Sequence, residues 1–66
     1  MNSSFQTHPN LIGARVTAYD YGTKTLNAPQ TIVAVSTGDR GLMIYTRDEN
    51  GTIYARAFAG CTVKFN

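Results

Sequence analysis

The stretch that decides the fold is Gly41-Leu-Met-Ile-Tyr-Thr-Arg-Asp-Glu-Asn-Gly-Thr-Ile-Tyr-Ala-Arg-Ala-Phe58. Two segments of alternating side chains flank Asn50-Gly51, a dipeptide that suits the positive φ angles of a tight hairpin turn. With these two residues as the whole loop, the expected cross-strand pairs are Glu49–Thr52, Arg47–Tyr54, Tyr45–Arg56 and Met43–Phe58. One face of the ribbon then carries the aromatic and basic side chains of Tyr45, Arg47, Tyr54 and Arg56. The opposite face carries the small apolar side chains of Leu42, Ile44, Ile53, Ala55 and Ala57.

The length of 66 residues predicts one small domain with a marginal core. A chain of this size buries only about 60% of the surface that its unfolded form exposes, and such domains often need a disulfide, a metal or a partner subunit. Cys61 is the single cysteine and His8 the single histidine, so an internal disulfide is excluded and a structural zinc site is not expected. Self-association is the remaining common route to stability, and a homo-oligomer is therefore expected.

The formal net charge is +2, and the pI is about 9.0. This mildly basic balance permits an anionic partner without requiring one. No apolar run approaches the ~18 residues of a membrane span, and no basic segment followed by an apolar one marks a secretory signal near the start. Together with the unpaired cysteine, these features favour a reduced, cytoplasmic setting and no membrane partner.

The chain divides into an arm and a domain. Residues 1–10 are polar, contain Pro9 and lack either periodicity, so a flexible N-terminal arm is expected. Residues 11–66 are expected to form one all-β domain of five strands. The first strand begins at Leu11 and points four side chains inward: Ile12, Ala14, Val16 and Ala18.

The later elements follow from the same reasoning. Residues 20–29 are expected to form a long, turn-rich connection, and the β-branched residues 30–37 a second strand. Gly38–Gly41 is a short turn into the hairpin, and residues 59–61 are long enough only for a 3₁₀ turn. Residues 62–65 close the domain as a fifth strand, with Val63 and Phe65 inward and Lys64 outward.

This order of strands and turns, without any segment of helical periodicity, resembles a small five-stranded SH3-like barrel over residues 11–66. An OB-fold is the alternative, and the lack of a helix before the last strand argues against it. In SH3-like barrels the loop between the first two strands often lines the binding groove. The resemblance therefore implies a binding role for Tyr21, Lys24 and Asn27.

A more distant resemblance is to the plasmid-borne, trimethoprim-resistant dihydrofolate reductases, SH3-like chains that form a tetramer around one shared pore. The likeness depends on Ile32-Val33, on Ile53-Tyr54 and on a short last strand with asparagine at the end. In that family the isoleucine-tyrosine pair is preceded by glutamine and followed by proline, whereas this chain has Thr52 and Ala55. Loss of the glutamine removes a key ligand contact. The resemblance thus implies the architecture, and a ligand site built from several copies, but not the activity.

The candidate ligand-binding residues are aromatic or basic: Tyr19, Tyr21, Lys24, Arg40, Tyr45, Arg47, Tyr54 and Arg56. Tyrosine rings stack on bases, which is worth about 1–3 kcal/mol per base, and guanidinium groups bind phosphates in a bidentate manner. Arg15 and Lys64 are expected on the same outward face. The same residue types also stabilise ordinary sheets through cross-strand pairs and are frequent in protein interfaces.

Nothing in the sequence points to catalysis. His8 lies in the arm without an orienting partner, Cys61 has no predictable basic neighbour, and the carboxylates fall in turns or at strand ends. We therefore expect a non-enzymatic binding protein, without metal or cofactor, that holds a nucleotide, a cyclic oligonucleotide or single-stranded nucleic acid. Small chains without catalytic residues are frequent among phage-encoded inhibitors of host defences, so an inhibitor of this kind that acts in the host cytoplasm is one expectation for this chain. The alternative is a protein–protein interaction module or an inhibitor that binds a partner protein.

Overall fold

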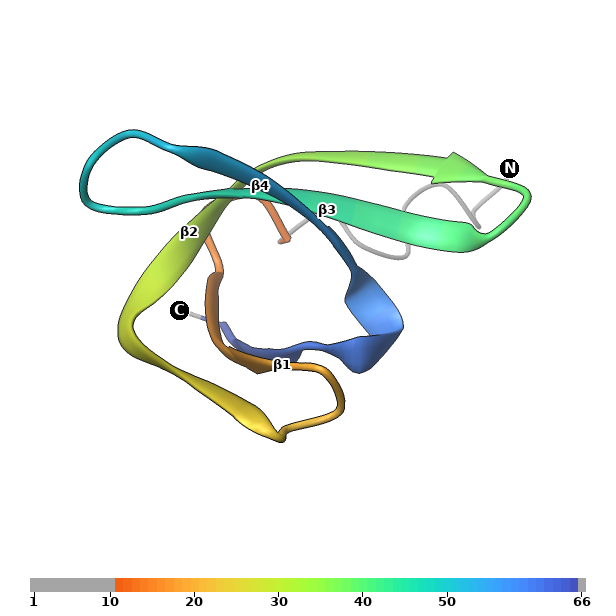
Figure 1. The fold of residues 1–66 in the computed structure, drawn as a ribbon. Helices are drawn as coiled ribbons and strands as arrows, with labels where there is room; N and C mark the ends of the chain where they lie inside the picture. The colour runs from red at the N-terminus through yellow and green to blue at the C-terminus, as the bar shows by residue number, and fades with distance from the viewer. Residues whose placement is uncertain (1–10, 66) are drawn as a thin grey trace.

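The computed structural model describes residues 11–65, which form a single five-stranded antiparallel sheet in the order β4-β3-β2-β1-β5 (Figure 1). The strands are β1 (Arg15–Tyr19), β2 (Lys24–Gly38), β3 (Gly41–Arg47), β4 (Ile53–Ala57) and β5 (Thr62–Lys64). A 3₁₀ helix, η2 (Phe58–Gly60), lies between β4 and β5. The all-β prediction is confirmed. The sheet is open rather than a closed barrel, because its pairing leaves β4 and β5 as edges. The expected arm, residues 1–10, lies outside the described residues.

The core lies inside the curl of the sheet, whose long bent strand β2 runs between the β1–β5 half and the β3–β4 half (Figure 1). Its buried members are Leu11, Ala14, Val16, Ile32 and Ile44. Burial of a leucine, valine or isoleucine side chain contributes about 1.5–3 kcal/mol through removal of its surface from water, and the single methyl group of Ala14 contributes less. We call the side of the sheet that carries these residues the inner face and the opposite side the outer face.

The start of the first strand differs from the prediction. Leu11 is 1% exposed, whereas Ile12, which was expected to point inward, is 54% exposed. The cause is a turn at Gly13, where φ is +93° and the amide of Ala14 donates a hydrogen bond to the carbonyl of Leu11 over 3.0 Å. The alternation therefore begins after this turn, and β1 begins at Arg15.

The connection between β1 and β2 is also shorter than expected. β2 begins at Lys24, which pairs with Tyr19, so the turn occupies residues 20–23 rather than residues 20–29. Residues 26–29 are part of β2 but bulge out of the ladder, because pairing with β1 passes from Thr25 directly to Gln30. The turn is held by the Thr23 hydroxyl, which donates to the carbonyl of Asp20 over 2.7 Å.

The remaining connections agree more closely with the sequence. The β2–β3 turn closes with Gly38 opposite Gly41, as predicted, and η2 ends one residue before the expected 3₁₀ turn does. In the last strand Val63 packs against the core, as predicted. Phe65 was expected to point inward, but it follows the end of β5 and is 56% exposed.

The β3–β4 hairpin has a different register from the one predicted. Its pairs are Met43–Ala57, Ile44–Arg56, Tyr45–Ala55, Thr46–Tyr54 and Arg47–Ile53. Every partner in β4 is thus displaced by one residue from its expected place. Because side chains alternate along a strand, this displacement moves the whole of β4 to the opposite face.

The loop explains the displacement. A two-residue type I′ turn needs positive φ at both central residues, but here Gly51 has a φ of +87° and Asn50 does not have a positive φ. Instead the carboxylate of Asp48 accepts hydrogen bonds from the amides of Asn50 and Thr52, both over 2.9 Å. The amide of Gly51 donates to the carbonyl of Asp48, and the amide of Asp48 donates to the carbonyl of Thr52. These bonds define a three-residue loop with glycine in the left-handed position.

The predicted binding face is therefore divided between the two sides of the sheet. Tyr54 and Arg56 share the inner face with their partners Thr46 and Ile44, whereas Tyr45 and Arg47 lie on the outer face. The expected grouping of all four side chains on one face is wrong. The expected apolar face is wrong in the same way, since three of its members lie on the outer face: Ile53, Ala55 and Ala57.

Candidate functional site

A buried polar cluster on the inner face joins three strands. Gln30 of β2 and Thr46 of β3 are 7% and 0% exposed, and the Thr46 hydroxyl donates to Gln30 Oε1 over 2.8 Å. Arg56 of β4 donates to the same oxygen from Nη2 over 3.1 Å. A buried side-chain oxygen needs such partners, because an unsatisfied one costs about 1–3 kcal/mol. In the sequence, the only indication of this cluster is the position of Thr46, two residues after Ile44, because alternation places both side chains on the same inward face.

Arg56 also stacks on two tyrosine rings. Its Cζ lies 4.1 Å from the ring centroid of Tyr19 and 5.0 Å from that of Tyr54, both within reach of a cation–π interaction. Its Nε is buried without a hydrogen-bond partner in the described part of the chain. The structure thus brings three predicted site residues together, but the guanidinium that was expected to face a ligand is engaged by Gln30 and by the two rings.

Tyr54 extends this cluster to the hairpin loop. Its hydroxyl donates to Asp48 Oδ2 over 3.0 Å. That bond raises the pKa of Tyr54 above its ordinary value, because ionisation would place two negative oxygens together. The pKa of Asp48 is lowered, chiefly by the hydrogen bond from the amide of Thr52 and also by the bonds from Tyr54 and Asn50. The carboxylate of Asp48 therefore acts as a structural anchor of the loop.

A small hollow of about 300 Å³ lies between the β1–β2 turn and β4. Tyr19 and Tyr21 line one side, Ala55 and Ala57 the other, and Cys61 lies with them. Tyr21 is 80% exposed, although its amide donates to the carbonyl of Gly60 over 2.8 Å. Burial raises the pKa of the Cys61 thiol, which favours the neutral form and argues against a nucleophile here.

A row of basic side chains crosses the outer face at the other end of the ladder. Lys64 of β5 lies directly opposite Arg15 of β1, Arg15 lies opposite Thr31 of β2, and Thr31 lies opposite Arg47 of β3. We call Lys64, Arg15 and Arg47 the cationic row. All three side chains are exposed, and none of them forms an ion pair with another residue of the described range 11–65. Neighbouring strands are about 4.8 Å apart, so the backbones of Arg15 and Arg47 are separated by about 10 Å.

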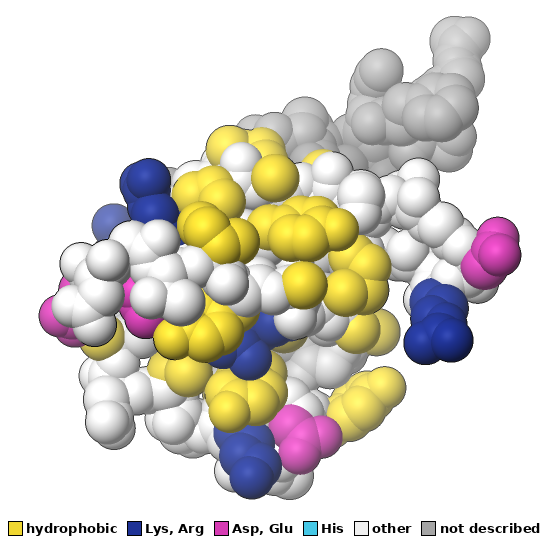
Figure 2. All heavy atoms as spheres, turned by 45° about the horizontal axis from the view of Figure 1, so that its top comes forward, with side chains coloured by type: hydrophobic (Ala, Val, Ile, Leu, Met, Phe, Trp, Pro, Cys, Tyr) yellow, Lys and Arg dark blue, Asp and Glu magenta, His cyan; other side chains and the backbone are white. Residues whose placement is uncertain are grey.

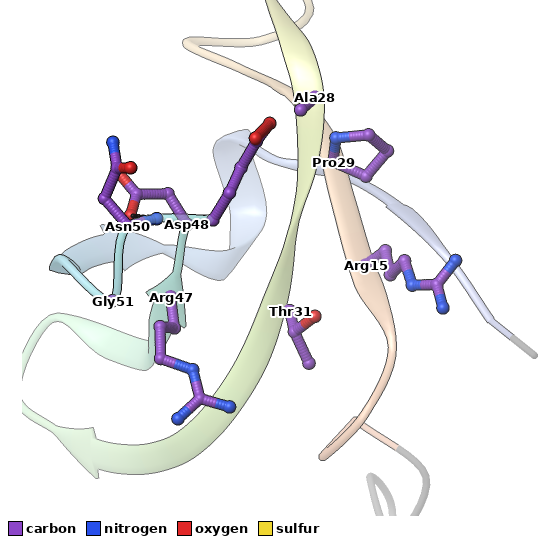
Figure 3. Close-up of a pocket in the computed structure, with 9 residues that line it drawn as sticks. Arg15, Ala28, Pro29, Thr31, Arg47, Asp48, Asn50 and Gly51 are labelled. Carbon is purple, nitrogen blue, oxygen red and sulfur yellow. Dashed lines mark hydrogen bonds between the residues drawn. The ribbon is translucent and has the colours of Figure 1, made fainter.

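Two members of the cationic row, Arg15 and Arg47, line the larger hollow, which has a volume of about 720 Å³. Figure 3 shows Arg15 and Arg47 on either side of Thr31, with Pro29 at one end and the loop of Asp48 across from it. The Glu49 side chain also lines the hollow on the loop side. The two guanidinium groups are therefore the cationic part of a concave, largely polar surface.

The other predicted site residues are spread over the molecule. Tyr45 lies on the outer face two residues before Arg47, is half-buried, and has its hydroxyl 3.1 Å from the Ser36 hydroxyl. Lys24 is exposed at the start of β2, opposite Tyr19. Arg40 is exposed in the β2–β3 turn, at the far end of that ladder from Arg47.

Sequence reasoning placed Arg15 and Lys64 on an outward face but did not select them as ligand-binding residues. The missing information was the register of β1 with β2 and with β5, which aligns both residues with Arg47. Alternation within one strand predicts which side a residue takes. It does not predict which residue of a distant strand lies beside it.

Comparison of the chain with protein-family models, with curated proteins and with solved structures found no match. Within residues 11–65, no group of three or more His, Cys, Asp or Glu side chains is placed to hold a metal ion. The same range contains no helix with the length and apolar character that crossing a membrane requires. His8 lies outside the described residues.

Proposed function

We propose that this chain is a non-enzymatic binding protein that holds a phosphate-bearing ligand, a nucleotide or single-stranded nucleic acid, on the cationic row of its outer face. The observation that carries the proposal is the alignment of Lys64, Arg15 and Arg47 along one transverse row of the sheet. A protein that binds such a ligand without acting on it sequesters it, as an inhibitor of a nucleotide-dependent process does.

The charges of the row support this proposal. Arg15 and Lys64 are directly opposite each other, and like charges at such positions destabilise a sheet, whereas opposite charges gain about 0.2–1 kcal/mol. An anion placed among these cations removes the repulsion and adds charge-assisted hydrogen bonds. The repulsion between Arg15 and Lys64 lowers the stability of the sheet, and a single acidic residue at either position would have removed that repulsion.

The size of the hollow and one nearby aromatic side chain fit the same ligand class. The hollow of about 720 Å³ falls within the range of ~300–1,000 Å³ that is usual for small-molecule sites. Tyr45 lies on the same face as Arg47 and supplies an aromatic side chain for stacking on a base. This arrangement keeps the outer half of the Tyr/Arg surface expected from the sequence and replaces its inner half with Arg15 and Lys64.

The relation of this open sheet to known small β folds is also part of what we propose. We infer that the open sheet is a variant of the SH3-like barrel. The position of β5 beside β1 and the 3₁₀ helix before the last strand support this inference.

Titration of nucleotides and short single-stranded oligonucleotides against purified variants tests the function. Arg47→Ala and Arg15→Ala are each expected to weaken binding by about 10-fold or more, since a hydrogen bond to a charged group is worth about 1.5–3 kcal/mol. Arg40→Ala is the matched control, because it removes another exposed arginine from the far end of the β2–β3 ladder, and its affinity should stay close to that of the wild type.

The Arg56→Ala variant distinguishes a ligand site on the outer face from one on the inner face. It is expected to lower the free energy of unfolding by about 1–3 kcal/mol, because it breaks the bond to Gln30 and both ring contacts, while affinity is retained. No binding by the wild type, or equal affinities of the Arg15, Arg47 and Arg40 variants, would exclude the cationic row as a ligand site. Loss of binding in a stable Arg56→Ala variant would move the site to the inner face.

The alternative function, a protein-interaction module, is favoured by a different observation. Ile53 continues the cationic row on β4, is apolar and is 52% exposed. On the face of the molecule that Figure 2 shows, hydrophobic side chains lie next to one another. A partner protein held there would depend on aromatic and aliphatic anchors, and its affinity would change little with salt. Phosphate binding, in contrast, weakens steeply as ionic strength rises.

A further inference from the structure

We propose that the free edge of β4 pairs with β4 of a second copy of this chain, antiparallel and centred on Ala55, to join two sheets into one. This inference depends on the backbone of β4 and not on ligand binding, so either proposal can fail without the other.

The two edges of the sheet are very different. β5 has three residues and ends in Lys64, and short strands and lysines are common devices against edge-to-edge pairing. β4 has five residues, contains neither lysine nor proline, and pairs with β3 without any register shift. Its single charged side chain, Arg56, is bound to Gln30 on the inner face. Within residues 11–65, β4 is therefore the edge strand that lacks features against pairing with another strand.

The backbone groups that point away from β3 can be assigned from the ladder. The amide of Asp48 donates to the carbonyl of Thr52, so these residues form a hydrogen-bonded pair, and such pairs alternate along an antiparallel ladder. Tyr54 and Arg56 consequently direct their amides and carbonyls toward β3. Ile53, Ala55 and Ala57 direct theirs toward the free edge. The carbonyl of Ala57 is engaged within its own chain, because Ala57 is the N-cap of η2 and its carbonyl also accepts the Cys61 thiol over 3.4 Å. Only the amide of Ala57 is therefore available to a partner strand.

A two-fold axis at Ala55 pairs the available amides and carbonyls of the two strands. Ala55 lies opposite the partner's Ala55, and Ala57 lies opposite the partner's Ile53, so the amides of Ala55 and Ala57 meet the outward carbonyls of the partner's Ala55 and the partner's Ile53. On the inner face Tyr54 lies opposite the partner's Arg56. The symmetric arrangement thus places arginine against tyrosine, a favourable cross-strand pair, and never places arginine directly opposite arginine.

The side chains of β4 also favour a second copy as the occupant. On the outer face Ile53, Ala55 and Ala57 are apolar and exposed, and in the joined sheet they lie in the middle, with one cationic row on each side. The small hollow of about 300 Å³ next to Ala55 and Ala57 leaves room for side chains of the incoming strand. A chain of 66 residues with a small core gains from the added burial.

The test introduces a charged side chain at the symmetry axis. Ala55→Lys and Ala55→Glu each place two like charges opposite each other in the dimer, about 5.5 Å apart at Cα. Native mass spectrometry and sedimentation of the full chain, whose monomer is 7.2 kDa, should show a wild-type dimer and monomeric single variants. An equimolar mixture of the two variants should restore a dimer that contains one of each. Ala34→Lys is the matched control, since Ala34 is exposed on the same face but belongs to β2, and it should remain dimeric.

Amide hydrogen exchange of the wild type tests the same pairing without any substitution that could itself alter the fold. The amides of Ala55 and Ala57 should become protected by at least tenfold as the protein concentration rises through the dissociation constant. A wild type that stays monomeric, dimers that persist in both Ala55 variants, or an Ala34→Lys variant that dissociates equally would each overturn the proposal. A monomeric wild type that captures an extended peptide on β4 counts against it as well.

Discussion

At the scale of single residues, Asp48 shows how one side chain decides the arrangement of a face. Its carboxylate binds the amides of Asn50 and Thr52, which closes the loop one residue earlier than a two-residue turn would. Because a strand has a period of two, that single residue places Tyr54 and Arg56 on the inner face.

Asp48 also makes the stability of the hairpin depend on pH. The bond from the amide of Thr52 lowers its pKa below the ordinary value of ~3.9, so the carboxylate form is stabilised by folding. This contribution is fully present above the ordinary pKa and is lost as the pH falls below it through the lowered pKa of the folded state. Urea unfolding followed by circular dichroism from neutral to acid pH should show this loss in the wild type.

The Asp48→Asn variant is the control for that measurement. It should be less stable at neutral pH and should lack this acid-dependent component, because its amide oxygen is not ionised. If the Asp48→Asn variant keeps the full acid sensitivity of the wild type, the effect belongs to another carboxylate.

At the scale of elements, the turn type can be tested by a single proline. In the observed loop Glu49 is the first central residue of a type I turn that begins at Asp48, a position that proline favours. Glu49→Pro should therefore be tolerated or should raise the free energy of unfolding by about 0.4–1 kcal/mol. In the two-residue loop expected from the sequence, the amide of Glu49 would pair with Thr52, and proline would remove that bond. Marked destabilisation by Glu49→Pro in urea unfolding, with Glu49→Ala as the control, would thus contradict the observed loop.

The elements also show what the sequence could and could not predict. Five strands, the turn at Gly38–Gly41, the 3₁₀ turn and the inward Val63 follow from local alternation and turn chemistry. The outward direction of the Ile12 side chain and the register of β4 could not be predicted in this way, because Gly13 and Asn50-Gly51 are each compatible with more than one type of turn. Hydrogen bonds within the loop select one of these turns, and the pattern of apolar residues does not reveal which.

At the scale of the whole molecule, the candidate site is a product of several registers at once. Lys64, Arg15 and Arg47 come from the last, first and third strands, and three separate ladders align them. Composition, with a net charge of +2, only permitted an anionic partner. The alignment of the three cations, two of which line one hollow, required the pairing of distant segments, which alternation within each strand leaves open.

This alignment gives the ligand proposal a quantitative consequence. If all three cations contact phosphates of a single strand, the logarithm of the association constant should fall with the logarithm of the salt concentration with a slope of about −2, since each contact contributes about −0.7. Lys64→Ala should reduce the steepness by about 0.7, whereas Arg40→Ala should leave the slope unchanged. Fluorescence anisotropy with a labelled oligonucleotide measures these slopes directly. A flat dependence in the wild type would instead indicate apolar contacts around Ile53, and an equal change in both variants would show that the ligand responds to net charge rather than to the row.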